Sequence, residues 1–82
     1  MPNINLTAKT KVDLYVASGI AVGTPIVVSN LGTGDVRLST SEAGLINDFV
    51  PLDSYEQAVN KATDPGAWAF SVSGAGVNVK EA

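Results

Sequence analysis

The chain has 82 residues, of which eight are acidic and five basic, and its formal net charge at pH 7 is −3. Because it contains neither His nor Cys, a Ser-His-Asp triad, a cysteine nucleophile, an ordinary zinc or haem site and a disulfide framework are excluded. The acidic balance argues against nucleic-acid binding through a basic face. Charged residues make up only 16% of the chain and hydrophobic residues 45%. We therefore expect part of the surface to be buried against other chains.

The N-terminal region, residues 1–10, has no basic segment followed by an apolar one, so we expect no signal peptide and synthesis in a cytoplasm. Ile4 and Leu6 alternate with polar residues, which predicts a first strand or an arm that docks on a neighbouring chain. We expect residues 11–82 to form a single β-domain. The most apolar stretch, 12–28, contains glycine and proline and is shorter than the roughly 20 residues of a membrane-spanning helix, so no membrane contact is expected.

A two-residue periodicity dominates the segment after this N-terminal region. Val12, Leu14 and Val16 recur at alternate positions, which predicts a strand with these three side chains on its inward face. Tyr15 then falls on the opposite side of the strand, where it lies near the surface or in an interface.

The segment 26–29 is rich in β-branched residues and carries Val27 between two other apolar residues. It therefore predicts a strand that is covered on both faces. Turn residues at 30–35 separate it from a second alternating run at 36–39, so we expect 25–39 to form a hairpin. Arg37 lies on the polar face of the second strand, where pairing with a nearby carboxylate is expected.

The segment 54–62 holds the one helical pattern of the chain. Ser54 and Gln57 have the spacing of a capping box, and apolar residues follow at three- and four-residue intervals. We expect a short helix near 54–62, with an irregular loop as the alternative.

The C-terminal segments 67–73 and 76–80 alternate again and are joined by glycines, which predicts a second hairpin. Trp68, Phe70 and Val72 fall on one face of its first strand. We interpret this face as part of the core. The alternative is an exposed aromatic anchor for a partner chain or a sugar ring.

These patterns together predict an all-β protein, a small antiparallel β-sandwich or barrel of about six short strands. We expect no catalytic residue and no cofactor, because the glycines at 32–34 and 74–76 do not lead from a strand into a helix, as phosphate binding requires. Asp48, Asp53 and Glu56 carry oxygen ligands suited to a cation such as Ca²⁺. Their spacing matches no known loop motif, so we expect a solvated acidic edge and no metal site.

Five segments of the sequence are similar to small structural proteins of tailed bacteriophages, including head-decoration and head-fibre proteins. They are DLYVASGIAVGT at 13–24, the strands at 27–30 and 36–38, the aromatic GAWAFSVSG at 66–74 and the closing strand at 77–79. The middle of the chain, 40–62, lies outside the resemblance. The resemblance implies an antiparallel β-fold, symmetric oligomers on a virion and no catalysis.

The expected function is therefore that of a non-enzymatic virion structural protein, a capsid-decoration, fibre or tail accessory protein. Its expected partners are further copies of itself, with a trimer favoured, and other virion proteins such as the major capsid protein. The alternative is a β-module that binds carbohydrate or another component of a host surface. The candidate interface residues are Ile4, Leu6, Tyr15, Val27 and Trp68.

Overall fold

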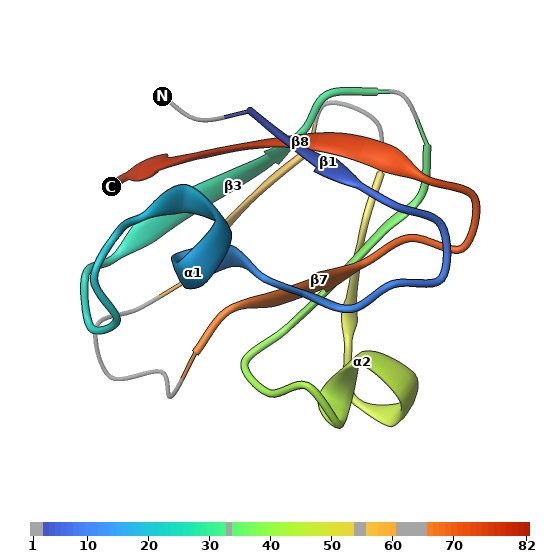
Figure 1. Cartoon of the computed structure of the whole chain (residues 1–82), viewed down its shortest axis with the longest axis horizontal. Coiled ribbons are helices and arrows are strands. Elements are labelled where there is room, and N and C mark those ends of the chain that lie inside the picture. Colours follow the sequence, from blue (N-terminus) through green and yellow to red (C-terminus); the bar gives the residue numbers. More distant parts are fainter. Residues whose placement is uncertain (1–2, 33, 54–55, 61–65) are drawn as a thin grey trace.

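The structure is a computed structural model of the whole chain, and it describes residues 3–32, 34–53, 56–60 and 66–82, of which 58–60 are described by their backbone alone (Figure 1). Within these residues the chain forms eight strands and two short helices. In chain order they are β1 (Asn3–Leu6), β2 (Val12–Asp13), α1 (Leu14–Ser18), β3 (Ile26–Asn30), β4 (Val36–Ser39), α2 (Gly44–Asn47), β5 (Val50–Leu52), β6 (Gln57–Asn60), β7 (Trp68–Phe70) and β8 (Ala75–Glu81). Neither of these helices is long and apolar enough to cross a membrane.

The strands form two antiparallel four-stranded sheets, with the orders β1-β8-β3-β6 and β2-β7-β4-β5. We call them the first and the second sheet. Only the connection from β4 to β5 stays within one sheet, and it carries α2; each other connection crosses to the opposite sheet. This strand order is that of a jelly roll, a double-sheet fold that closes two Greek keys on one core. The expected small antiparallel sandwich is confirmed, with two further strands, β5 and β6, beyond the six expected.

The core lies between the two sheets and is built from the inward side chains of both. Alternate residues of the first sheet point inward, as their burial shows, and α1 closes one side of the space between the sheets (Figure 1). The buried cluster consists of Ile4, Leu6, Leu14, Tyr15, Ile26, Val28, Val36, Leu52, Ala67, Ala69, Val77 and Val79.

The strand expected from Val12 to Val16 is wrong after its second residue, where the chain turns into α1. Asp13 caps this helix, because its Oδ1 accepts hydrogen bonds from the backbone N–H groups of Tyr15 (3.0 Å) and Val16 (3.3 Å). Gly19 ends it with φ of 76°, a left-handed conformation that favours glycine. The alternating pattern is therefore overridden by the capping residues, and the side chain of Val16 is 78% exposed.

The helix expected near 54–62 is also wrong over the part that the structure describes. Gln57–Asn60 form β6, which pairs with β3 in the register Val28↔Ala58. Before it, the Asp53 N–H donates to Glu56 Oε1 (2.6 Å) and the Glu56 N–H donates to the Asp53 carbonyl (2.9 Å). These two bonds join Asp53 to Glu56 directly before β6. The expected cap at Ser54 lies outside the described residues.

Both expected hairpins are wrong in their pairing. The strands at 26–30 and 36–39 belong to different sheets, and so do β7 and β8. Alternation identifies a strand and its two faces, but it does not identify the partner strand. The connections at 31–35 and 71–74 cross the roughly 10 Å between stacked sheets, so they join strands that face each other across the core.

Candidate functional site

The outer side of the second sheet carries aromatic side chains. Trp68 and Phe70 of β7 are both half-buried, whereas Ala69 between them is completely buried on the inner side. In the register of the sheet, Trp68 lies opposite Ser39 and Phe70 opposite Arg37. The inner side of β7 therefore holds small residues, and its aromatic residues face outward. We call the outward residues Phe49, Pro51, Trp68 and Phe70, together with Arg37 and Ser39, the aromatic face.

Arg37 lies at the centre of this face, between two aromatic rings. Its Cζ is 4.5 Å from the centroid of the Phe49 ring and 5.8 Å from that of the Phe70 ring. A planar guanidinium at such distances is held by cation–π attraction. The expected pairing with a carboxylate is wrong within the described residues, where the Arg37 guanidinium makes neither an ion pair nor a hydrogen bond. Its N–H donors remain available to a partner.

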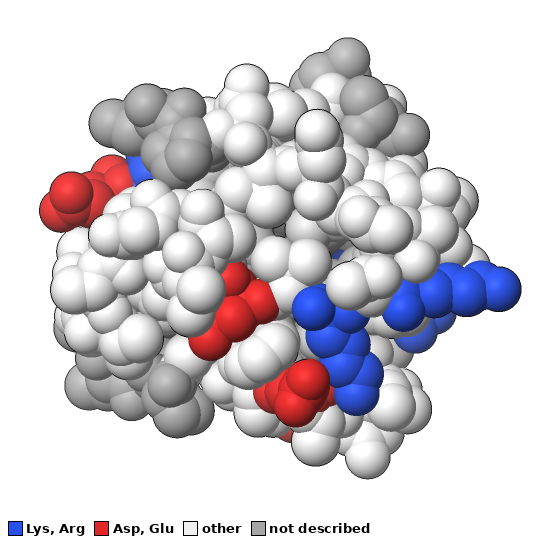
Figure 2. Space-filling view, in the orientation of Figure 1, with Lys and Arg blue, Asp and Glu red and all other residues white. Residues whose placement is uncertain are grey.

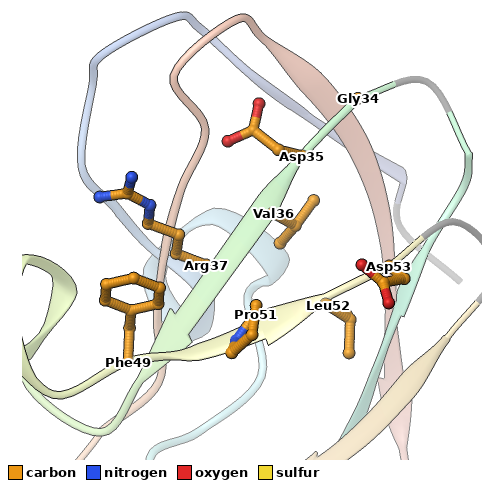
Figure 3. A pocket seen from close by; sticks show the side chains of 8 residues that line it. All are labelled: Gly34, Asp35, Val36, Arg37, Phe49, Pro51, Leu52 and Asp53. Atoms are coloured by element: carbon orange, nitrogen blue, oxygen red, sulfur yellow. The ribbon is translucent and has the colours of Figure 1, made fainter.

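A shallow hollow of about 400 Å³ lies beside Arg37 (Figure 3). The residues that line it include Asp35, Arg37 and Asp53 together with Phe49 and Pro51. The side chains of Asp35 and Arg37 point to the same side of β4, away from Val36 (Figure 3). The hollow thus offers both signs of charge next to apolar surface.

The Asp35 carboxylate fastens the start of β4 to the turn between β7 and β8. Its Oδ1 accepts hydrogen bonds from Ser71 Oγ (3.2 Å) and Ser73 Oγ (2.8 Å), and its Oδ2 accepts one from the Val72 N–H (3.1 Å). The bond from Val72 is the largest cause that lowers the pKa of Asp35 from 3.8 to about 2, followed by the bond from the Ser73 hydroxyl. At neutral pH this group is therefore an anion that accepts hydrogen bonds and has no proton to give.

Asn30, at the end of β3, fixes the neighbouring turn from inside the core. Its Nδ2 donates to the carbonyl oxygens of Gly34 (3.0 Å) and Leu52 (2.9 Å), and its Oδ1 accepts from the Gly32 N–H (2.8 Å). All three bonds serve the backbone, so this buried amide is structural. It holds the loop that leads into Asp35 and Arg37.

Three of the five interface residues expected from the sequence are buried in the core. Ile4 and Leu6 of β1 are 9% and 3% exposed, and β1 pairs with β8 of the same chain. Tyr15 lies in α1 and is 2% exposed, and its hydroxyl donates to the Thr24 carbonyl oxygen (2.8 Å). The expectation that Tyr15 lies near the surface is therefore wrong. None of these three side chains presents a surface to another molecule in this fold.

The other two candidates, Val27 and Trp68, are half-buried, but they lie on different sheets. Val27 is on the outer side of the first sheet, opposite Lys80 in the register. The structure thus does not gather the five candidates, and only Trp68 belongs to the aromatic face. Phe49 was missed because it lies in the irregular stretch before β5. The number of residues between Arg37 and Phe49 matches no strand or helix period, so the sequence does not indicate that the two side chains meet.

The described residues form no group of three or more acidic side chains that could hold a metal ion. In the view of Figure 2, several Lys and Arg side chains gather at the lower right beside acidic ones, and uncharged side chains cover most of the rest. The chain matches no protein-family model, no curated protein and no solved structure.

Proposed function

We propose that this chain is a non-enzymatic structural protein of a phage virion, which works as a homo-oligomer and binds other virion proteins. The aromatic face carries the proposal. Trp68 and Phe70 keep part of their large apolar surface on the outside of the sandwich, where only an associated molecule would cover it. Aromatic residues and Arg are the types that dominate the energy of protein interfaces.

Two further observations support this proposal. A charged share of 16% leaves few side chains to keep the surface solvated. The jelly-roll strand order occurs in viral capsid proteins, although a fold by itself does not define a function. The sequence resemblance to head-decoration and head-fibre proteins points the same way. A protein on the capsid, at the base of a fibre or in the tail would in each case use such a surface. For a decoration protein on the capsid, the partner we propose is the major capsid protein.

The mass in solution tests the oligomer. Multi-angle light scattering after gel filtration, from about 1 to 100 µM protein, should give a multiple of the 8.4 kDa of one chain. The trimer favoured by the sequence analysis would give three times that mass. A monomer over the whole range would refute self-association. In parallel, antibodies against the chain should label purified virions, and unlabelled virions would refute the placement on the particle.

A second candidate is a carbohydrate-binding module, which the outward position of Trp68 favours. Aromatic rings beside Arg, Asp and Ser side chains provide stacking and hydrogen bonds for a sugar, and lectins also use the jelly roll. Tyr15 takes no part, because it is buried. Because Trp68 is the only Trp of the chain, its fluorescence should change on adding a bound glycan. An unchanged signal across a glycan panel would remove this candidate.

A further inference from the structure

Two residues of the second sheet, Arg37 and Phe70, and two residues just beyond the ends of its strands, Asp35 and Val72, form an arrangement that is complementary to itself. Arg37 lies beside Phe70 in the register of β4 and β7, and Asp35 lies beside Val72, whose N–H it binds. Arg37 and Asp35 are two residues apart on one side of β4 (Figure 3). Phe70 and Val72 are likewise two residues apart along the chain, and Val72 is 43% exposed. We call these four residues the quartet.

From this arrangement we infer that the quartet, together with the adjoining aromatic face, binds a second copy of the same chain. The two β4 strands pack face to face and antiparallel around a two-fold axis that lies over Val36. The inference rests on the proposed homo-oligomer and names its surface. A rotation about that axis exchanges positions 35 and 37, so each Arg37 meets the partner copy's aspartate, and each Phe70 meets the partner copy's valine. A two-fold contact requires this kind of self-complementary patch.

The charges on the page fit this occupant. The Arg37 guanidinium is held by two rings and makes no hydrogen bond or ion pair within the described part of the chain. Asp35 Oδ2 accepts one hydrogen bond, from Val72, and a carboxylate oxygen has room for a second. An arginine already fixed by stacking loses little freedom when it binds a carboxylate. Residues two apart along a strand are separated by roughly 7 Å, so both ion pairs form in one contact.

The outer side of the first sheet makes a matched control. Lys80 of β8 is exposed there and lies opposite Val27 in the register. Arg37→Glu and Lys80→Glu change the net charge equally, but only the first places like charges across the inferred axis. The wild type should have twice the 8.4 kDa mass of one chain. Arg37→Glu should raise the dissociation constant of the dimer by about tenfold or more, and Lys80→Glu should leave this constant unchanged.

A rescue experiment tests the pairing itself. Asp35→Lys alone should also weaken the dimer, because it sets two cations against each other. A mixture of Arg37→Glu and Asp35→Lys chains should restore a mixed dimer, since both contacts then join opposite charges. The only Trp of the chain lies on this face, so its emission gives an independent readout as protein concentration rises. Circular dichroism establishes that each variant is folded, and if Asp35→Lys is not, the Arg37→Glu and Lys80→Glu pair decides.

The outcomes separate the inference from the proposed function. A wild-type monomer at every concentration overturns both. A trimer, or a dimer that Arg37→Glu leaves as tight as the wild type, overturns the two-fold contact and leaves the homo-oligomer standing. A dimer that Arg37→Glu and Lys80→Glu weaken equally also overturns it, because the effect is then one of net charge.

Discussion

The two sheets of the sandwich share an inner side and differ on their outer sides. On the first sheet the outer side holds Val27 beside polar side chains: Asn78 Nδ2 donates to Asn3 Oδ1 (2.9 Å), and Ser29 lies opposite Asn78 in the register. On the second sheet the outer side holds Trp68 and Phe70. Both sheets alternate in the same way, so the period alone does not distinguish a polar outer side from an aromatic one. The type of residue on the outer side does.

The comparison depends first on which side of β7 faces the core. Ala69→Leu adds three carbon atoms to a site with no exposed surface and should lower the free energy of unfolding by about 2–3 kcal/mol. Trp68→Ala removes a much larger side chain, but from a half-buried outer position, and should lower it by only about 1–2 kcal/mol. Urea unfolding followed by circular dichroism measures both. A larger loss for Trp68→Ala would show that the aromatic side chains face inward.

The second comparison sets one outer side against the other. Phe70→Ala removes a ring that contacts the Arg37 guanidinium and should lower the free energy of unfolding by about 1–2 kcal/mol. Val27→Ala on the first sheet removes less surface from a half-buried position, and about 0.5 kcal/mol is expected. Chemical denaturation at a protein concentration low enough to keep both variants monomeric gives these values. Equal losses would show that the two outer sides contribute equally to the free energy of unfolding.

The turn that supports the aromatic face should respond to acid. The pKa of Asp35 is lowered to about 2 in the folded chain, mainly by the hydrogen bond from the Val72 N–H. The folded state therefore gains stability from this group above the ordinary pKa of 3.8 and loses it as the pH falls through about 2. Because the carboxylate is exposed and screened by solvent, we expect a contribution of about 1 kcal/mol. The wild type should lose this contribution between pH 4 and pH 2. The Asp35→Asn variant has no carboxylate to protonate at this position, so its free energy of unfolding should fall by correspondingly less over the same range.

The smallest expected effect concerns the planar shape of Arg37. Arg37→Lys keeps the charge and loses the flat guanidinium that stacks between the rings of Phe49 and Phe70, so a loss of about 0.5–1 kcal/mol is expected. Lys80→Arg on the other sheet is the matched change, and it should be neutral within about 0.5 kcal/mol. If the two variants melt at the same temperature, the stacking contributes nothing to stability.

Sequence reasoning located six of the eight strands and the fold class, because alternation is a local property that survives in the folded chain. It placed β2 with too many residues, since the two capping residues of α1, Asp13 and Gly19, act against the alternation of Val12, Leu14 and Val16. It missed β5 and β6, because three or four residues without clear alternation give no period to detect.

The candidate site was only partly accessible in the same way. The shared side of Trp68, Phe70 and Val72 follows from their spacing, and it is confirmed for the two residues that lie in β7, Trp68 and Phe70. Which side faced the core did not follow, because a strand with small residues on one side and large ones on the other fits either orientation. Large apolar residues usually face inward, but here the small residues Ala67 and Ala69 are the buried ones.

The sequence by itself determined the β-rich architecture, the positions of its main strands and the chemistry that the chain lacks, because these depend on composition and on neighbours along the chain. Only the tertiary structure decided which strands pair, which side of β7 is buried, and that Arg37 stacks between Phe49 and Phe70. These features depend on contacts between residues far apart in sequence, and no local pattern encodes them.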